Sequence, residues 1–284
     1  EDTRLFNGAV NDFPRVETLV LESTYGGRND YQTDQQDSEK RLIEVINETY
    51  DRGGKVVIPA FAVGRSQEIM LVLEEAMRSG KIPEMPVHLD GMIWEATAIH
   101  TTYPEYLRDD LRDRIFHEDE NPFLAEEFNH IDGGEEERQD VADGEQAIIL
   151  STSGMVTGGP IMSWLRHVGP DPKSRLVFVG YQAQGTLGRR IQNGWDEIPV
   201  NGRDGMGRSD TLKLEMDVET VDGFSGHADR QGLENFVKTM NPRPEKVLCV
   251  HGDERSVQDL SSALYHDYNM RTFAPKNLET FRFK

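Results

Sequence analysis

The sequence is poor in cysteine and in long apolar runs. Its single cysteine, Cys249, excludes an internal disulfide framework, and the apolar letters VLCV around it predict a buried, reduced thiol. The most apolar stretch, residues 55–64, is far shorter than the roughly 20 residues that span a membrane. We therefore expect a cytoplasmic protein without a membrane segment.

Lysine is also scarce, with nine lysines among 31 basic residues. These bases oppose 51 acids, so the formal net charge is -20. A surface this acidic repels itself, and salt relieves the repulsion because the Debye length falls to about 3 Å at 1 M. We interpret the composition as halophilic, an adaptation to a salt-rich cytoplasm; an ordinary acidic protein is the alternative.

Several catalytic signatures are missing. The chain has no GxxxxGK[ST] phosphate loop, no GxGxxG after a strand, no GxSxG elbow and no EF-hand loop. These absences argue against nucleotide-dependent phosphoryl transfer and serine hydrolase chemistry. Ser225, His227 and Asp229 do not predict a triad, because a spacing of two along the chain does not build that geometry.

Strand and helix patterns alternate along most of the chain, which predicts an α/β fold with a parallel sheet. We expect strands at residues 16–22, 55–59, 87–89, 147–150, 175–179, 246–250 and 271–273, and helices at 34–51, 65–78, 94–101, 161–167, 229–240 and 256–268. Residues 112–146 are acidic and irregular, so we expect a solvated excursion there. The alternation of Leu212, Leu214, Met216 and Val218 predicts one half-exposed strand.

Glycine-rich turns follow three of the expected strands. Residues 153–160, SGMVTGGP, lie between a strand and a helix, where backbone amides favour an anion, and Gly154, Gly158 and Gly159 permit close approach. Arg65 and Ser66 begin another helix after a strand, and residues 180–190 form a third such turn. Turns of this kind are also common for purely structural reasons, so phosphate binding is one of two interpretations.

His227 and His251 each follow an apolar run in a small glycine-bearing turn. If the two runs are adjacent strands, both histidines join one site, as metal ligands or proton donors. A hydrogen-bonded structural role is the alternative, because a complete zinc site needs three or four ligands. The other histidines show no ligand spacing and are expected at the surface or in packing: His88, His100, His117, His130, His167 and His266.

Five ordered stretches together resemble the β-CASP branch of the metallo-β-lactamase superfamily, and most closely its archaeal cleavage and polyadenylation specificity factor type. They are LESTYGGR, IPAFAVGRSQE, STSGMVTGGP, DGFSGHADR and VLCVHGDE. The resemblance implies a Rossmann-like β-CASP domain with a parallel sheet, inserted in a metallo-β-lactamase αββα domain of which only the later part is present. It also implies a zinc-dependent endoribonuclease, with possible 5′ exonuclease activity, in mRNA 3′-end processing or decay.

The resemblance assigns roles to residues that match the family motifs. Glu22 and His227 are implied to be catalytic, with His227 as general acid and Glu22 as its hydrogen-bonded partner, while His251 is implied to bind metal. Histidine at position 251, where DNA-processing relatives usually have valine, favours RNA over DNA repair. Arg65, Ser66, Ser153, Gly154, Gly158 and Gly159 are implied to grip single-stranded RNA.

One departure from the family pattern limits these expectations. The intact enzymes bind two zinc ions, mostly through an HxHxDH segment that has no counterpart here. The chain also begins without methionine or a signal-like segment, so we expect a fragment that lacks a complete zinc site and nuclease activity. A non-catalytic RNA-binding scaffold of the same family is the alternative function.

Domain boundaries and an oligomeric state follow from the same comparison. We expect residues 1–27 to carry a lactamase strand and the first motif, 28–208 to form the β-CASP domain and 209–284 to complete the lactamase domain. The strand-like C-terminal stretch, residues 274–284, suggests sheet addition to a partner and therefore a homodimer through the C-terminal region. Because the net charge opposes a polyanion, we expect RNA contacts to be local, at Arg65, Arg189, Arg190 and backbone amides.

Overall fold

The computed structural model describes residues 3–8, 13–118, 120–203 and 209–282. The chain forms two compact units, the first from residues 1–8 and 34–225 and the second from residues 9–33 and 226–284. Among the described residues, no helix combines the length and apolarity that crossing a membrane requires. The predicted family boundaries at residues 27/28 and 208/209 stay predictions; chain contacts divide the molecule at other points.

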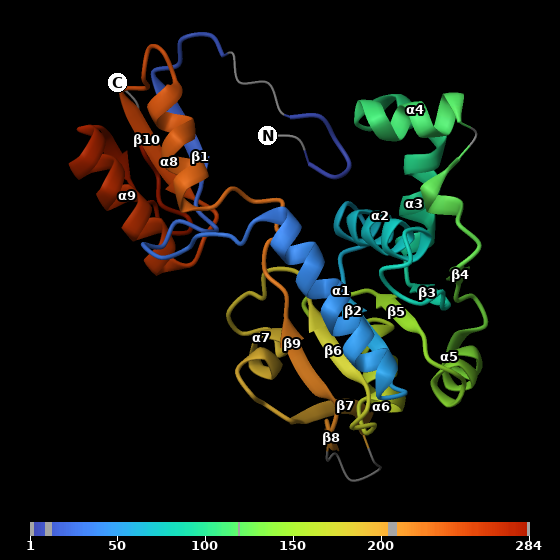
Figure 1. Cartoon of the computed structure of the whole chain (residues 1–284). Coiled ribbons are helices and arrows are strands. Elements are labelled where there is room, and N and C mark those ends of the chain that lie inside the picture. Colours follow the sequence, from blue (N-terminus) through green and yellow to red (C-terminus); the bar gives the residue numbers. More distant parts are fainter. Residues whose placement is uncertain (1–2, 9–12, 119, 204–208, 283–284) are drawn as a thin grey trace. The chain divides into compact units, whose positions relative to one another are not determined.

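A six-stranded parallel sheet forms the centre of the first unit (Figure 1). Its strands lie in the spatial order β4 (Phe128–His130), β3 (Val87–Asp90), β5 (Ile148–Ser151), β2 (Val56–Pro59), β6 (Arg175–Phe178) and β9 (Asp217–Thr220). Every residue of β2, β5 and β6 is buried, as continuous apolar strands inside a parallel sheet require. The predicted α/β fold with a parallel sheet is therefore confirmed.

Helices cover both faces of this sheet because successive strand side chains point in opposite directions. Val56 and Ile58 of β2 pack in one core cluster with buried residues of α1 (Gln35–Asp51) and α2 (Arg65–Arg78). Val57 packs in another with α6 (Ile161–Val168) and α7 (Leu187–Gln192). The remaining helical elements of this unit are α3 (Ile93–Thr102), η1 (Pro104–Tyr106), α4 (Asp109–His117), η2 (Pro122–Leu124) and α5 (Gly134–Asp143).

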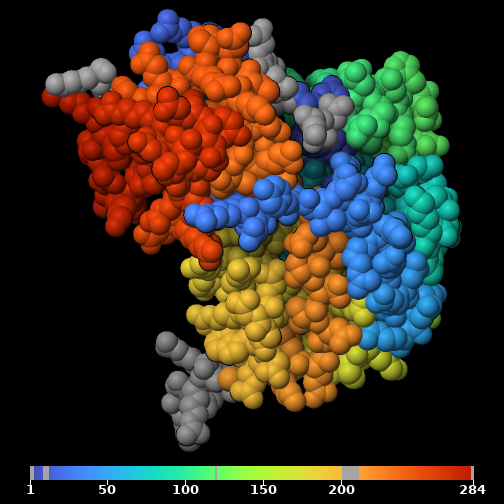
Figure 2. All heavy atoms as spheres, turned by 60° about the vertical axis from the view of Figure 1, so that its left-hand side comes forward, coloured from blue at the N-terminus to red at the C-terminus, as the bar shows by residue number. Residues whose placement is uncertain are grey.

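The helix α1 shows how the sequence sets these boundaries. Asp34 caps the first turn by accepting a hydrogen bond from Gln36 N at 2.9 Å. Apolar residues at helical spacing, such as Leu42 and Val45, are buried, whereas Glu44 and Glu48 are exposed. The blue segment that contains α1 lies at the surface in Figure 2. Gly53, with a φ of +75°, provides the left-handed position that ends the segment.

The expectation of a solvated excursion over residues 112–146 is wrong. This stretch contains part of α4, the 3-10 turn η2, strand β4 at the sheet edge and all of α5, and it buries Phe123 and Phe128. The sequence pattern missed β4 because three residues are too few to show periodicity. It missed α5 because that helix has no fully buried residue: only Val141 and Ala142 pack, partly buried, against the core, and polar contacts also hold the helix.

Two further expectations differ from the structure. The alternating residues 212–218 form parts of two strands, β8 (Ser209–Lys213) in a hairpin with β7 (Glu197–Arg203) and β9 in the main sheet. Between them the chain turns across the end of α6, where the amides of Glu215 and Met216 donate to Gly169 O. No strand forms in residues 274–282, the described part of the C-terminal stretch.

The second unit is built on a three-stranded parallel sheet in the order β1 (Thr18–Glu22), β10 (Lys246–Val250) and β11 (Arg271–Phe273). Its helices are α8 (Arg230–Thr239) and α9 (Glu254–Tyr268), and Leu233, Val247 and Leu260 lie in their shared core. Cys249 is buried in β10, as predicted, and burial raises the pKa of its thiol to about 11. This cysteine is therefore a packing residue.

Candidate active site

Three side chains suited to metal binding and proton transfer lie together in the second unit. Glu22 ends β1, His227 precedes α8 and His251 follows β10, and one ligand atom from each lies within 4.8 Å of the others. β1 and β10 are adjacent and parallel, with Glu22 paired to Val250, so both strands deliver their next residues to one edge. The structure thus brings together the three residues that the sequence singled out.

The route by which His227 reaches this edge differs from the expectation. The strand before it, β9, belongs to the six-stranded sheet and not to the sheet of β1 and β10. His227 is instead held by the turn into α8, where Asp229 is the N-cap and its Oδ1 accepts Gly232 N at 2.7 Å. Because the Asp229 carboxylate caps this helix, rejection of a Ser225, His227 and Asp229 triad remains sound.

The contact between Glu22 and His227 joins an acid to an imidazole. Glu22 Oε1 lies 3.4 Å from His227 Nδ1, and its other oxygen accepts the N–H of Thr24 at 2.8 Å. The side chain of Glu22 is 29% exposed and that of His227 is 41% exposed, so both are open to solvent. The rings of His227 and His251 lie 5.4 Å apart, with an angle of 34° between their planes.

The backbone around His251 explains why glycine follows it. A Cβ on Gly252 would lie 2.4 Å from Ser23 O, which is closer than any side chain permits. His251 has a φ of +52°, and its carbonyl accepts the N–H of Ser23 at 3.2 Å. Gly26 is similarly required, since its Cβ would lie 2.6 Å from Ser256 O. These close approaches fix the turn after β1 against the turn that carries His251.

Sequence reasoning missed three residues that support the cluster. Thr24 places its hydroxyl 3.2 Å from His251 Nδ1 and 3.4 Å from His227 Nδ1. Gln32 donates to His227 O at 2.6 Å, and the buried Arg230 donates to Gly26 O and to Glu234. The only sequence signal was their position within or beside the motifs, because the burial of a polar side chain is visible only in the fold.

The chemistry of this donor set fits a zinc ion in part. Zinc accepts imidazole nitrogen and carboxylate oxygen, and catalytic zinc sites commonly use three protein ligands. Ligands at about 2.1 Å from a tetrahedral zinc lie roughly 3.4 Å apart, whereas the three atoms here are held within 4.8 Å. Glu22 also already contacts His227 and Thr24. A histidine ligand such as His251 is therefore available, but the described residues offer no closed four-ligand cage at this cluster.

The predicted phosphate-binding turns lie at the carboxyl edge of the six-stranded sheet. β2 and β5 are neighbours, and their following helices, α2 and α6, pack on opposite faces of the sheet. Two neighbouring strands whose following helices pack on opposite faces mark the point where the strand order reverses, and ligands of α/β sheets usually bind there. A Cβ on Gly154 would lie 2.9 Å from Phe61 N, so the two turns are in direct contact.

The side chains at the start of α2 have partners within the protein. Arg65 pairs with Glu68, and its side chain is 12% exposed. Ser66 is buried and donates its hydroxyl proton to Phe61 O at 2.6 Å. In this structure both residues therefore shape the turn, and binding of an anion by Arg65 requires that it leave or share Glu68.

The turn from Ser153 to Gly159 is held by hydrogen bonds within the turn and by a hydrogen bond from Gln182. Ser153 Oγ accepts Thr157 N at 3.0 Å, and Gln182 donates from Nε2 to Gly154 O at 2.8 Å. Gly158 and Gly159 have φ values of +139° and +80°, which side-chain-bearing residues rarely adopt. The turn after β6, which contains Gln182, therefore braces the turn after β5.

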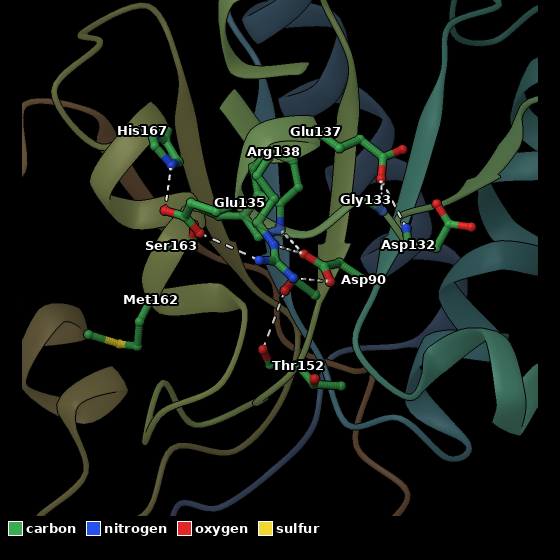
Figure 3. A network of polar contacts seen from close by, with 12 residues as sticks. Asp90, Asp132, Gly133, Glu135, Glu137, Arg138, Thr152, Met162, Ser163 and His167 are labelled. Atoms are coloured by element: carbon green, nitrogen blue, oxygen red, sulfur yellow. Dashed lines mark hydrogen bonds and ion pairs between the residues drawn. The ribbon is translucent and has the colours of Figure 1, made fainter. Parts of the chain in front are cut away.

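A buried ionic network lies at the end of β3, the strand next to β5 on the side away from β2 (Figure 3). Asp90, at the end of β3, is 1% exposed. Its carboxylate accepts hydrogen bonds from Arg138 Nε at 2.7 Å and from Trp164 Nε1 at 2.6 Å. The hydrogen bond with Asp90 raises the pKa of Arg138. The network fixes α5 and α6 to the strand that lies beside β5.

Comparison with protein families places both units. Residues 66–191 match the model of the Beta-Casp domain, and residues 211–275 match that of the Zn-dependent metallo-hydrolase RNA specificity domain. The chain belongs to the β-CASP family of metallo-β-lactamase-type proteins. The predicted family is thereby confirmed, and the second match includes His227 and His251 while Glu22 lies before both.

Archaeal relatives match nearly the whole chain. A protein named transcription termination factor FttA from Thermococcus kodakarensis is 56% identical over 283 residues, covering 99% of this chain and 43% of the relative. Proteins of the same name from Methanosarcina mazei and a Lokiarchaeum species are 55% and 45% identical, covering 99% and 100% of this chain and 44% of each relative. The chain thus spans less than half the length of these relatives.

Proposed function

We propose that the complete protein is a zinc-dependent ribonuclease that cuts single-stranded RNA at the 3′ ends of transcripts. The observation that carries this proposal is the convergence of Glu22, His227 and His251 at one edge of the β1–β10 sheet. The name of the relatives, transcription termination factor, supports action on nascent RNA over general mRNA decay. Cytoplasmic action and a homodimer through the C-terminal region are further parts of the proposal.

The residues of the cluster divide the chemistry between them. His251 would hold zinc, together with ligands outside this chain, and zinc when bound stabilises negative charge that develops on the phosphate. His227 donates a proton to the departing ribose oxygen. Glu22 accepts the Nδ1–H of His227, so it orients the ring and stabilises its protonated form.

RNA would be gripped at the turns after β2 and β5. Ser153, Gly154, Gly158 and Gly159 lie at the switch of strand order, where backbone amides suit a phosphate; the amide of Ser153 already donates to Gly158 O at 3.4 Å, so a phosphate would compete with that carbonyl. Ser66 supports the neighbouring turn through Phe61 O, and Arg65 supplies a guanidinium that phosphate would compete for against Glu68. Arg189 and Arg190 of α7 add positive charge after β6.

The decisive experiment measures cleavage of labelled single-stranded RNA by the complete protein with zinc in molar salt. We expect His227→Ala and His251→Ala each to lower the rate at least about 100-fold, because one removes a general acid and the other a metal ligand. His266→Ala, an exposed histidine on α9 in the same unit, is the matched control and should keep wild-type activity.

Each alternative has its own result in this assay. An inactive wild-type protein that still binds RNA would favour the non-catalytic scaffold, and faster cleavage of single-stranded DNA would favour a DNA repair nuclease. The 284-residue chain alone should be inactive because its described cluster holds too few ligands for two zinc ions. Zinc-dependent cleavage by this chain that is abolished by His251→Ala would contradict that expectation.

A further inference from the structure

The hydroxyl of Thr24 lies between His227 and His251 and contacts both residues. It is 7% exposed, and its Oγ1 makes three contacts, with His251 O at 3.3 Å, His251 Nδ1 at 3.2 Å and His227 Nδ1 at 3.4 Å. A threonine hydroxyl has one proton to donate and two lone pairs that accept. Three contacts therefore saturate it, provided that one is donated and two are accepted.

The neighbouring groups decide which contact is donated. The carbonyl of His251 is an acceptor only, so the contact with it requires the hydroxyl proton. An ionised Glu22 is also an acceptor only, so its contact with His227 Nδ1 requires a proton on that nitrogen. Both lone pairs of Thr24 then face Nδ1–H groups, one from each histidine.

We propose that Thr24 is a positioning residue whose hydroxyl holds His251 in the Nδ1–H tautomer and also accepts from the Nδ1–H that Glu22 fixes on His227. This arrangement leaves Nε2 of His251 as its metal-binding nitrogen and Nε2 of His227 as the nitrogen that takes up a proton and, from the protonated ring, delivers it. The use of the Nε2 atoms rests on the proposed function, whereas the tautomers are properties of this chain alone.

The tautomers are measured directly by long-range 1H–15N correlation spectra of the chain labelled with 15N-histidine. Spectra are recorded at a pH above which the ring signals no longer change, so that the neutral rings are observed. The signals are assigned by their loss in His227→Ala and His251→Ala. We expect both histidines to carry their proton on Nδ1 in the wild type.

The variants separate the hydroxyl from the shape of the side chain. In Thr24→Val, His251 should shift toward Nε2–H, the form that neutral histidine favours in water, while His227 stays Nδ1–H because Glu22 still accepts from it. Thr24→Ser should restore the wild-type spectrum. Thr239→Val, which removes an exposed hydroxyl on α8, is the matched control and should change neither signal.

Two results overturn the proposal. One is an Nε2–H proton on His251 in the wild type, a result that does not depend on whether Thr24→Val folds. The other is an unchanged His251 signal in folded Thr24→Val.

The complete protein provides a second measurement, by competition for zinc with a chromophoric chelator. We expect Thr24→Val to weaken binding at the zinc that His251 holds by about 10- to 100-fold, as loss of a partner behind a metal ligand typically does. Thr24→Ser should stay close to wild type, and equal affinities in all three proteins would contradict the role. A complete protein without nuclease activity would refute the proposed function but leave the tautomer result intact.

Discussion

His88 places an imidazole inside the main sheet without a partner for one of its nitrogens. It lies on β3 between Asn129 of β4 and Ile149 of β5, and its Nδ1 is buried without a hydrogen bond. Burial lowers the pKa of His88 below 6.5; Lys55 lowers this pKa further, and Glu137 raises it. The folded protein therefore favours the neutral form of the His88 ring over the charged form.

This lowered pKa makes stability depend on pH in a defined direction. The unfolded chain binds the His88 proton more readily, so the neutral ring's contribution is complete above about pH 6.5 and is lost as pH falls below it. We expect His88→Leu to make the unfolding free energy less pH-dependent between about pH 7 and 5, by at most the slope of one proton. Urea denaturation across this range measures the slope. His117→Leu, at a 75% exposed side chain of α4, is the control, and equal slopes in His88→Leu and wild type would contradict the prediction.

At the level of elements, α5 is joined to the sheet by charge and hydrogen bonds. Arg138 binds Asp90, and Glu135 accepts Ser163 Oγ at 2.6 Å and contacts His167 Nε2 at 2.9 Å on α6 (Figure 3). The hydrogen bond from Ser163 is the main cause of the lowered pKa of Glu135. These polar contacts add to the partial packing of Val141 and Ala142, which is too small to form the apolar stripe that usually identifies a surface helix.

The contribution of the Arg138–Asp90 ion pair to the free energy of unfolding can be tested by removing one of its charges. Arg138→Met would leave the carboxylate of Asp90 buried without its ionic partner, so we expect the unfolding free energy to fall by about 3–5 kcal/mol. Adding Asp90→Asn should restore part of the loss, because the uncompensated charge is then absent. Arg112→Met removes an exposed ion pair on α4 and should cost no more than about 1 kcal/mol. Equal losses in the two arginine variants by chemical denaturation would show that the buried pair has no special role.

For the whole molecule, the formal charge of -20 predicts a fold that depends on salt. We expect Tm to rise as KCl is increased from about 0.1 to about 2 M, because screening weakens repulsion among exposed acids. Sorbitol at matched osmolarity does not screen charge and should give a smaller rise. A Tm that stays constant or falls with KCl would contradict the halophilic interpretation.

Elements with strong local signals could be predicted from the sequence. The helix at Arg65–Arg78 and the strand at Lys246–Val250 have the predicted bounds, because apolar periodicity and turn residues mark both their type and their ends. β4 and α5 escaped prediction, since the first is stabilised by pairing with β3 and the second by ion pairs and hydrogen bonds. Interactions with distant residues leave no period in the local sequence.

In the candidate site, too, some residues could be identified from the sequence and others only from the tertiary structure. Sequence motifs alone selected Glu22, His227 and His251, because chemically suited residues stand in turns that match a family pattern. Only the tertiary structure revealed Thr24 between the two imidazoles, and only it showed that Arg65 and Ser66 already have partners within the chain. Sequence determines which donors and acceptors are present. Folding decides which of them meet, because a hydrogen bond depends on distances of a few ångströms between residues far apart in the chain.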